Sequence, residues 1–223
     1  MKYAISIIHP SRNRPTQAME TVKKWLSQAK NPKDIEYVIS LDSSDPKLEA
    51  YRAALQTIEK PYNLGITLHD NHTAIEAINN TAKLVSGNLL IVVSDDFDCP
   101  NLWDVALLDA LKGKKDFIVK TKDGLQPELI TLPIMDRAYY ERFGYIYFPQ
   151  YQHMFCDTEM TDVGHLLGKV IKLPITFYHR HYSTGLNKRD EISEKNDSTW
   201  KQGETLYNMR KVLNFGLLIP ATA

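Results

Sequence analysis

Short apolar runs alternate with amphipathic stretches through the first part of the chain. The apolar runs are rich in β-branched side chains and end at turn-forming residues, which is typical of strands. They occupy residues 3–8, 35–41, 64–68 and 89–93. Between them, apolar residues recur every three or four positions, as they do on the buried face of a helix. The helices predicted from this spacing occupy residues 16–29, 46–58 and 72–85.

This alternation predicts an α/β fold with a Rossmann-like, mostly parallel central sheet and helices on both faces. The run at 89–93 (LLIVV) is apolar at every position, so we expect a central strand that is covered on both sides. In such folds ligands bind beyond the carboxyl ends of the strands. Polar residues that directly follow the predicted strands are therefore the first candidates for a site.

The pattern becomes less regular after the fourth predicted strand. Further helices are predicted at residues 101–111, 137–143 and 162–168, and further strands at 117–120, 129–135 and 171–178. Residues 187–197 are polar and carry charges of both signs, so we expect a mobile loop there. The sequence contains no internal repeat and no linker that would divide it, which favours a single domain.

Composition narrows the classes of protein to be considered. The apolar fraction of 43% suffices for a sizeable core, and Lys plus Arg balance Asp plus Glu at 27 each. General binders of nucleic acid or of anionic membranes usually carry a basic excess instead. The longest apolar runs, at 88–93 and 215–223, fall far short of the ~20 residues of a membrane span, and no signal-peptide pattern opens the chain. We therefore expect a cytoplasmic protein with two reduced cysteines, Cys99 and Cys156.

An acidic cluster, Ser94-Asp95-Asp96-Phe97-Asp98, follows the predicted central strand directly. Three carboxylates in four residues repel one another unless a cation or hydrogen-bond donors are present. Mg²⁺ and Mn²⁺ take oxygen ligands of this kind and bridge to substrate phosphates. Asp96 and Asp98 can both face a metal if the end of the strand turns. The alternative is a solvated acidic turn in which Asp98 caps the next helix.

Two other predicted strand ends carry candidate ligand contacts. Asp42 follows the second strand and can accept hydrogen bonds from a nucleobase or a ribose, although Asp is also a common turn former. The segment after the first strand, HPSRNRP, carries Arg12 and Arg14, whose guanidinium groups match the oxygens of a diphosphate. Surface arginines beside a turn are the alternative. The segment has no glycine, so it is not a glycine-rich phosphate loop.

Two candidate groups lie in the less regular second half. Asp157 and Glu159 come between an aromatic segment and a predicted helix, where a carboxylate can act as a general base. The alternative is that Asp157 or Thr158 caps the helix. His179 and His181 lie two apart, so on a strand they share one face. There either one can complete a metal shell or contact phosphate, and a structural role is the alternative.

Three segments carry a resemblance to a known family when they are taken in order. They are SIIHPSRNRP, EYVISLDSSDP and AINNTAKLVSGNLLIVVSDDFD. With them the chain resembles the family 2 glycosyltransferases of the GT-A fold, well over residues 3–105 and more loosely over 140–182. The resemblance implies one GT-A-like domain over 1–223. Residues 1–105 would form its nucleotide-binding half, and 106–223 an acceptor-side half that ends in a C-terminal helix.

The resemblance also implies roles for individual residues on the donor side. Those that match the first loop, which contacts the nucleotide, are Pro10, Arg12 and Arg14. Asp42 matches the Asp that contacts the base. Asp96 and Asp98 match the DxD motif that holds Mn²⁺ or Mg²⁺ against the donor diphosphate, with Asp95 beside it on the nucleotide or sugar side.

In the second half, Asp157 or Glu159 is similar to the acidic residue that acts as catalytic base in inverting members. The run Cys-Asp-Thr-Glu-Met stands where the family more commonly has a Glu-Asp pair. His181, or else His179, resembles the late histidine that often completes the metal site. The reaction implied is a single displacement from a nucleoside-diphosphate sugar to an acceptor hydroxyl, with inversion at the anomeric carbon.

Other readings of the same residues stay open. A catalytically silent nucleotide-sugar binding module can use this fold, and a sugar nucleotidyltransferase shares the layout but normally has a glycine-rich first loop. The acceptor is expected to be a saccharide. A modified DNA base is the alternative, because the small size and the HPSRNRP opening resemble phage-type members and residues 112–122 are basic. The sequence leaves the sugar, the nucleobase, the acceptor and the oligomeric state open.

Overall fold

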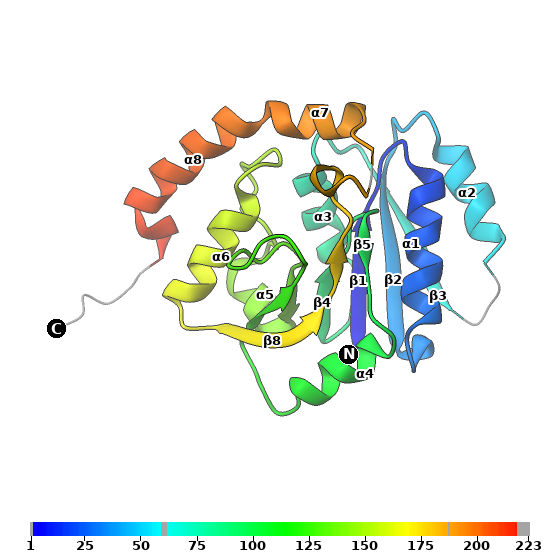
Figure 1. Ribbon diagram of the computed structural model, residues 1–223, viewed down its shortest axis with the longest axis horizontal. Helices are drawn as coiled ribbons and strands as arrows, with labels where there is room; N and C mark the ends of the chain where they lie inside the picture. Colours follow the sequence, from blue (N-terminus) through cyan, green and yellow to red (C-terminus); the bar gives the residue numbers. More distant parts are fainter. Residues whose placement is uncertain (1, 59–61, 187, 218–223) are drawn as a thin grey trace.

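A sheet of seven strands forms the centre of the protein (Figure 1). The computed structural model describes residues 2–58, 62–186 and 188–217. The strand order is β3-β2-β1-β4-β7-β6-β8, and only β7 runs antiparallel to its neighbours. The strands are β1 Ile5–Pro10, β2 Ile35–Asp42, β3 Asn63–His69, β4 Leu89–Val92, β6 Ile118–Lys122, β7 Ile134–Asp136 and β8 Val170–Thr176. The predicted α/β fold with a mostly parallel sheet is therefore confirmed.

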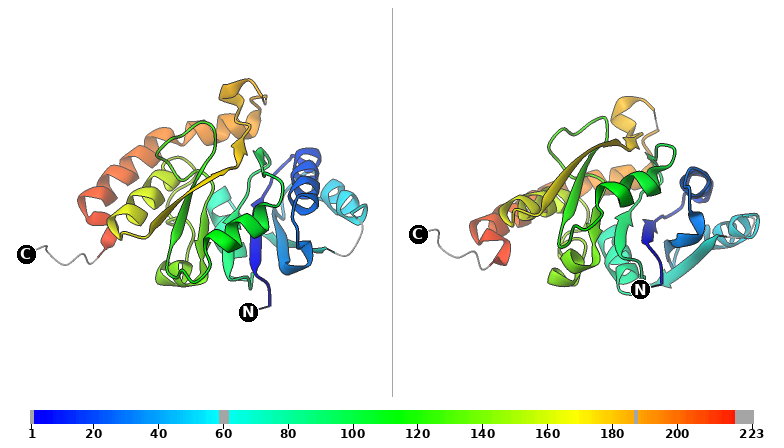
Figure 2. Two further views of the ribbon diagram at one scale, coloured as in Figure 1. Left: turned by 60° about the horizontal axis from the view of Figure 1, so that its bottom comes forward. Right: turned by 90° about the horizontal axis from the view of Figure 1, so that it is seen from below.

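Helices cover both faces of this sheet, as Figures 1 and 2 show. One face packs against α1 Pro15–Ser27, α2 Leu48–Gln56 and α4 Trp103–Ala110. The other packs against α3 Ala74–Ala82, α5 Arg137–Phe143, α6 Cys156–Leu166 and α8 Trp200–Val212. The chain also forms α7 Glu191–Ser198 and the short 3₁₀ turns η1 Pro32–Asp34, η2 Tyr182–Thr184 and η3 Asn214–Gly216.

The apolar run at 89–93 lies in the middle of the sheet, as its composition predicted. Successive residues of a strand point to opposite faces. Ile91 accordingly packs into the layer under α1 and α4, whereas Leu90 packs into the layer under α3 and α6. Because both sides are covered, each position of the strand must be apolar to avoid burying an unpaired polar group.

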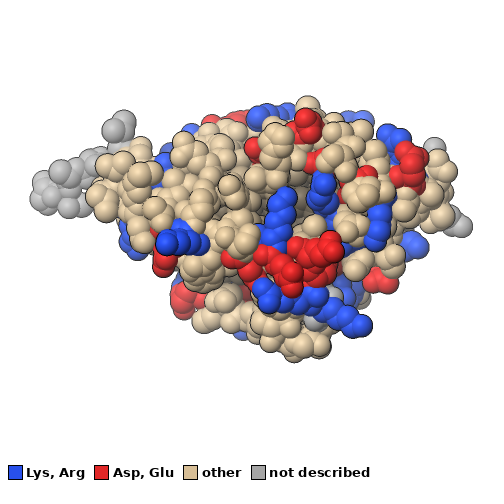
Figure 3. All heavy atoms as spheres, turned by 90° about the horizontal axis from the view of Figure 1, so that it is seen from above, with Lys and Arg blue, Asp and Glu red and all other residues tan. Residues whose placement is uncertain are grey.

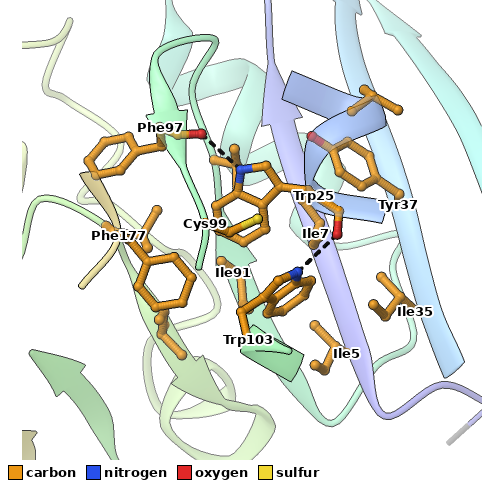
Figure 4. Close-up of a cluster of buried hydrophobic side chains, with 14 of the residues drawn as sticks. Ile5, Ile7, Trp25, Ile35, Tyr37, Ile91, Phe97, Cys99, Trp103 and Phe177 are labelled. Atoms are coloured by element: carbon orange, nitrogen blue, oxygen red, sulfur yellow. Dashed lines mark hydrogen bonds between the residues drawn. The ribbon is translucent and has the colours of Figure 1, made fainter. Parts of the chain in front are cut away.

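Two fully buried tryptophans anchor the segment that follows β4 (Figure 4). The indole Nε1–H of Trp25 donates to the carbonyl of Phe97, and that of Trp103 donates to the carbonyl of Trp25, both at 2.9 Å. Trp25 also stacks on Phe177 with ring centroids 5.4 Å apart. These contacts tie α1 and α4 to the two-stranded ladder of β5 Phe97–Asp98 and β9 Tyr178–His179, and so fix the acidic segment between β4 and β5.

The prediction of a loop at 187–197 is wrong for residues 191–197, which belong to α7; residue 187 lies outside the described residues. The carboxylate of Asp190 caps this helix by accepting from the N–H of Ser193 at 2.9 Å. Asp190 also pairs with Arg14, and Asp197 accepts from the hydroxyl of Tyr182. A polar helix of this kind depends on such tertiary contacts, which composition does not reveal.

The second half differs from the prediction in two further places. Of the strand expected at 129–135, only β7 forms, and α6 begins at Cys156 rather than at residue 162. The earlier start of α6 places Asp157 and Glu159 in its first turn. Within the described chain, none of the helices is both long and apolar enough to cross a bilayer. Residues 218–223 of the predicted apolar run at 215–223 lie outside the described residues.

Candidate functional site

The carboxyl ends of β1, β2 and β4 open into a cleft of about 1640 Å³. Figure 3 shows this face, where acidic and basic side chains gather around a hollow. The cleft is where a parallel sheet of this kind binds ligands. Most residues predicted from the sequence line it, namely Pro10, Arg12, Arg14, Asp42, Asp95, Asp96, Asp157, His179 and His181. Asp98 and Glu159 lie outside the described residues that form its walls.

Asp95 joins the first loop to the acidic segment. Its carboxylate accepts from Nε2 of His9 at 2.9 Å and from the hydroxyl of Ser11 at 3.1 Å. The other ring nitrogen of His9 bonds the hydroxyl of Tyr37 at 2.8 Å, and burial raises the pKa of Tyr37 well above its usual range. Because a carboxylate only accepts, Nε2–H of His9 is the donor to Asp95, and the hydroxyl of Tyr37 bonds the opposite side of the ring. The resulting network holds the two loops in a fixed relation.

Asp96 faces the cleft beside His179. Oδ2 of Asp96 lies 3.2 Å from Nε2 of His179, and Oδ1 accepts from the hydroxyl of Ser94 at 2.5 Å. Burial acts to raise the pKa of Asp96, but the hydrogen bonds from His179 and Ser94 outweigh it and hold the pKa below its ordinary value. His179 reaches this position because β9 pairs with β5, and its ring stacks on Phe97 at 4.3 Å. The ring of His181 lies 5.1 Å from that of His179.

Asp98 is directed away from Asp96. Its carboxylate pairs with Nζ of Lys24 at 2.7 Å and with Nε of Arg180 at 3.2 Å. The turn that contains Asp95 and Asp96 is closed by the N–H of Phe97, which donates to the carbonyl of Ser94 at 3.2 Å, and Asp98 follows it in β5. The prediction of a metal site formed by Asp96, Asp98 and His181 or His179 is therefore not confirmed. Within the described chain, no group of three or more His, Cys, Asp or Glu side chains is arranged to hold a metal.

The first loop and the end of β2 form another wall of the cleft. Asp42 accepts from the N–H and the hydroxyl of Ser44 at 2.7 and 2.6 Å, and Arg12 lies 3.2 Å from the same carboxylate. Burial works to raise the pKa of Asp42, yet these contacts lower it. Arg14 reaches across to Asp190, with its Nε at 2.7 Å from the carboxylate. Both guanidinium groups thus stay at the cleft and are oriented by carboxylates.

Asp157 and Glu159 have different surroundings, although the sequence leaves them equivalent. Asp157 lines the cleft at the start of α6, and burial raises its pKa above the ordinary value. Glu159 is 4% exposed and forms a bidentate pair with Arg210 at 2.8–2.9 Å, while it also accepts from the hydroxyl of Tyr151 at 2.8 Å. All of its contacts point to a role in packing α6 against α8.

Replacing Glu159 by Gln is expected to lower the free energy of unfolding by about 3 kcal/mol, because the largely buried guanidinium of Arg210 loses its counter-charge. Urea denaturation measures this loss. Asp162→Asn is the matched control on the same helix, since Asp162 is 35% exposed and its pair with Lys211 contributes less than about 1 kcal/mol. Equal losses for the two variants would contradict a structural role for Glu159.

His153 is a cleft residue that the sequence did not single out. It lines the cleft, and its Nδ1 is buried without a hydrogen-bond partner among the described residues. Burial lowers the pKa of His153, so the ring is neutral and can accept or donate a hydrogen bond. The only signal in the sequence is a polar residue within an aromatic segment, four positions before Asp157.

Comparison with known proteins agrees with this architecture. The sequence model described as glycosyl transferase family 2 matches residues 6–168. No curated protein matches the sequence significantly. Among solved structures, the mannosyltransferase PcManGT from Pyrobaculum calidifontis, in complex with GDP-Man and Mn²⁺, is similar with a TM-score of 0.65 at 15% identity. That likeness covers 80% of this chain and 57% of PcManGT.

Structures of S. aureus TarS are similar as well. TarS has a TM-score of 0.60 at 17% identity over 80% of this chain and 36% of its own. The structure of TarS residues 1–349 in complex with UDP-GlcNAc has a TM-score of 0.56 at 17% identity. That likeness covers 85% of this chain and 59% of the TarS chain. This chain therefore spans less than two thirds of each of these proteins, and at such identities the likeness shows the fold. With nearly three quarters of its length matched by the family, the chain belongs to glycosyl transferase family 2 and has a GT-A-type fold.

Proposed function

We propose that this protein transfers a sugar from a nucleoside-diphosphate sugar to an acceptor hydroxyl. The observation that carries the proposal is the meeting of three kinds of group in one cleft. Asp42 with Arg12 and Arg14, the Asp95-Asp96 pair, and Asp157 come from segments far apart in the sequence and share its walls. Recognition of a nucleotide, neutralisation of a diphosphate and removal of a proton each need one of these groups.

The donor is assigned to the side of the cleft formed by β1 and β2. Asp42 is held by Ser44 in an orientation that allows its free lone pairs to accept from a base or ribose. Arg12 and Arg14 supply guanidinium groups for the diphosphate, and Pro10 ends β1 beside them. Structures of PcManGT and TarS hold GDP-Man and UDP-GlcNAc, which supports a nucleotide-sugar donor here without naming it.

Asp96, together with His181 or else His179, would hold Mn²⁺ or Mg²⁺. Asp96 fits a cation because its lowered pKa keeps it charged, and burial lowers the pKa of His181, so that ring offers a neutral nitrogen. A small set of protein ligands suffices for these ions when diphosphate oxygens and water fill the rest of the shell. The bound ion would neutralise negative charge on the leaving diphosphate.

The chemical step we infer is a direct displacement. As the bond from the anomeric carbon to the diphosphate oxygen breaks, the acceptor oxygen forms a new bond to that carbon on the opposite face. Attack on the opposite face inverts the configuration of the anomeric carbon, and Asp157 takes the proton of the acceptor hydroxyl. Arg12 and Arg14 keep the diphosphate in place while its charge grows. Of the two carboxylates considered, Asp157 is proposed because it lines the cleft, whereas Glu159 is paired with Arg210.

Thermal unfolding with UDP, GDP, CMP and dTDP, each with Mn²⁺ and each with EDTA, tests the donor site. We expect one nucleoside diphosphate at about 100 times its Kd to raise Tm by roughly 5–10 °C with Mn²⁺ and by much less with EDTA. The corresponding nucleotide sugar should then release that diphosphate on turnover. If the nucleotide binds but the nucleotide sugar is not turned over with any acceptor tested, the protein is a catalytically silent binding module. No shift with any nucleotide would contradict the proposal.

A further inference from the structure

Trp200 presents an exposed aromatic face to the cleft. It is the first residue of α8, it is 53% exposed, and it lines the cleft wall. The other two tryptophans, Trp25 and Trp103, are fully buried. At about 1640 Å³ the cleft is larger than the roughly 300–1,000 Å³ that one small ligand occupies. There is room for a second ligand beside the donor, and the half-exposed indole of Trp200 lines that space.

The indole lies next to the segment that carries Asp157. Its ring packs edge-to-face on Phe155, with centroids 5.0 Å apart at 73°. Phe155 caps α6 in a left-handed conformation with φ of 70°, two residues before Asp157. Such a conformation is unfavourable for a bulky residue and must be held by its surroundings. A ligand on Trp200 would therefore lie beside the start of α6.

The beginning of α8 is clamped to residues 150–155. The N–H of Met154 donates to the hydroxyl of Thr199 at 3.2 Å, and Gln202 donates to the carbonyl of Gln150 at 3.3 Å. Gly203 approaches the carbonyl of Met154 so closely that a Cβ would lie 2.3 Å from its oxygen. These contacts hold the start of α8, and with it the backbone of Trp200, against the segment that leads to Asp157.

Polar groups surround this apolar face. Gln152, Asn196 and Asp197 line the cleft together with Trp200, and Asp197 accepts from the hydroxyl of Tyr182 at 2.8 Å. Amides and carboxylates beside an aromatic face match a pyranose, whose C–H face packs on the ring while its hydroxyls form hydrogen bonds.

We propose that Trp200, backed by Phe155, is the platform on which a pyranose ring of a saccharide acceptor stacks. The inference rests on the proposed function and assigns its acceptor class. It places the acceptor at the wall of the cleft formed by α6 and α8, whereas the loop with Arg12 and Arg14 is assigned to the donor. The platform binds and orients the acceptor, and Asp157 alone is assigned the proton transfer.

Intrinsic fluorescence tests the platform directly. Because Trp25 and Trp103 are fully buried, a ligand in the cleft changes the emission mainly through Trp200. The wild-type protein, with Mn²⁺ and UDP or GDP, is titrated with methyl glycosides of glucose, galactose, mannose and N-acetylglucosamine in both anomeric forms, and with their disaccharides. We expect a saturable change of emission with at least one of them.

Saturation-transfer NMR with the bound glycoside then compares variants. Trp200→Ala should weaken binding at least tenfold and Trp200→Phe much less, since a phenyl ring retains part of the stacking face. Met209→Ala is the matched control, because Met209 is 56% exposed on the same helix and is not part of the described cleft wall. It should bind as the wild type does.

Three outcomes would overturn the platform: no glycoside gives a saturable change, Trp200→Ala binds as tightly as the wild type, or a labelled DNA duplex binds through Trp200 where the glycosides do not. The nucleotide-induced thermal shift is measured on every variant. Its absence in all proteins, the wild type included, counts against the proposed function. Its presence without any effect of Trp200 counts against the acceptor platform alone.

Discussion

Replacing Asp96 by Asn should remove the metal-dependent thermal shift and lower turnover by at least about a hundredfold. Asp96 is the carboxylate that lines the cleft beside His179, and its lowered pKa keeps it charged at neutral pH. Asn keeps the shape but loses the charge that a divalent cation requires. Isothermal titration of the nucleoside diphosphate with and without Mn²⁺, together with kcat, measures both effects.

Asp98→Asn is the matched control for this change. It removes an identical carboxylate two residues away, which pairs with Lys24 and Arg180 outside the cleft wall. We expect it to retain metal-dependent nucleotide binding and to lose no more than about 1 kcal/mol of stability, because these ion pairs are partly exposed. If Asp98→Asn abolished metal binding and Asp96→Asn did not, the assignment of Asp96 would be wrong.

Replacing Asp157 by Asn should lower kcat by about 10²–10⁴ while the affinity for the nucleoside diphosphate changes little. The amide cannot accept the proton of the acceptor hydroxyl, yet it fills the same space at the start of α6. Steady-state kinetics with varied donor and acceptor separate these effects. The control is Asp162→Asn, the same change on a more exposed part of the helix. An unchanged kcat in the Asp157 variant would remove it as the base.

The pH dependence of kcat gives a second measure of Asp157. Burial raises the pKa of its carboxyl, and a general base acts only when it is deprotonated. The rate should therefore rise with pH through the raised pKa, so the acid limb lies above the ordinary Asp value of about 3.9. The limb should be lost in Asp157→Asn. If the acid limb of kcat gave a pKa at or below the ordinary Asp value, a group other than Asp157 would control the rate.

The alternation of apolar runs and amphipathic helices was sufficient to predict the first half of the fold. The strand expected at 35–41 is β2 Ile35–Asp42, and the helix expected at 72–85 contains α3 Ala74–Ala82. Hydrophobic periodicity reports local structure and burial, because a strand covered on both sides must be apolar throughout. The place of the site followed from this topology, since the carboxyl ends of parallel strands meet at one edge.

The same reasoning could not resolve the second half. Residues 191–198 are polar, and their helix depends on Asp190 and on its partner Arg14, which precedes it by 176 residues. The composition of the segment itself cannot indicate a partner so far away in the sequence. His153 was missed for a similar reason, because only the folded structure shows that its ring lines the cleft.

By itself, the sequence determined the fold class, the family and the set of acidic, basic and histidine residues from which a site could be built. Which members of that set lie together in the cleft was decided by tertiary structure. Asp96 and Asp157 face the cleft, while Asp98 and Glu159 are held by Lys24, Arg180 and Arg210. The physical reason is that a carboxylate takes its role from the charges and donors that the fold brings within a few ångströms, and most of these come from distant parts of the chain.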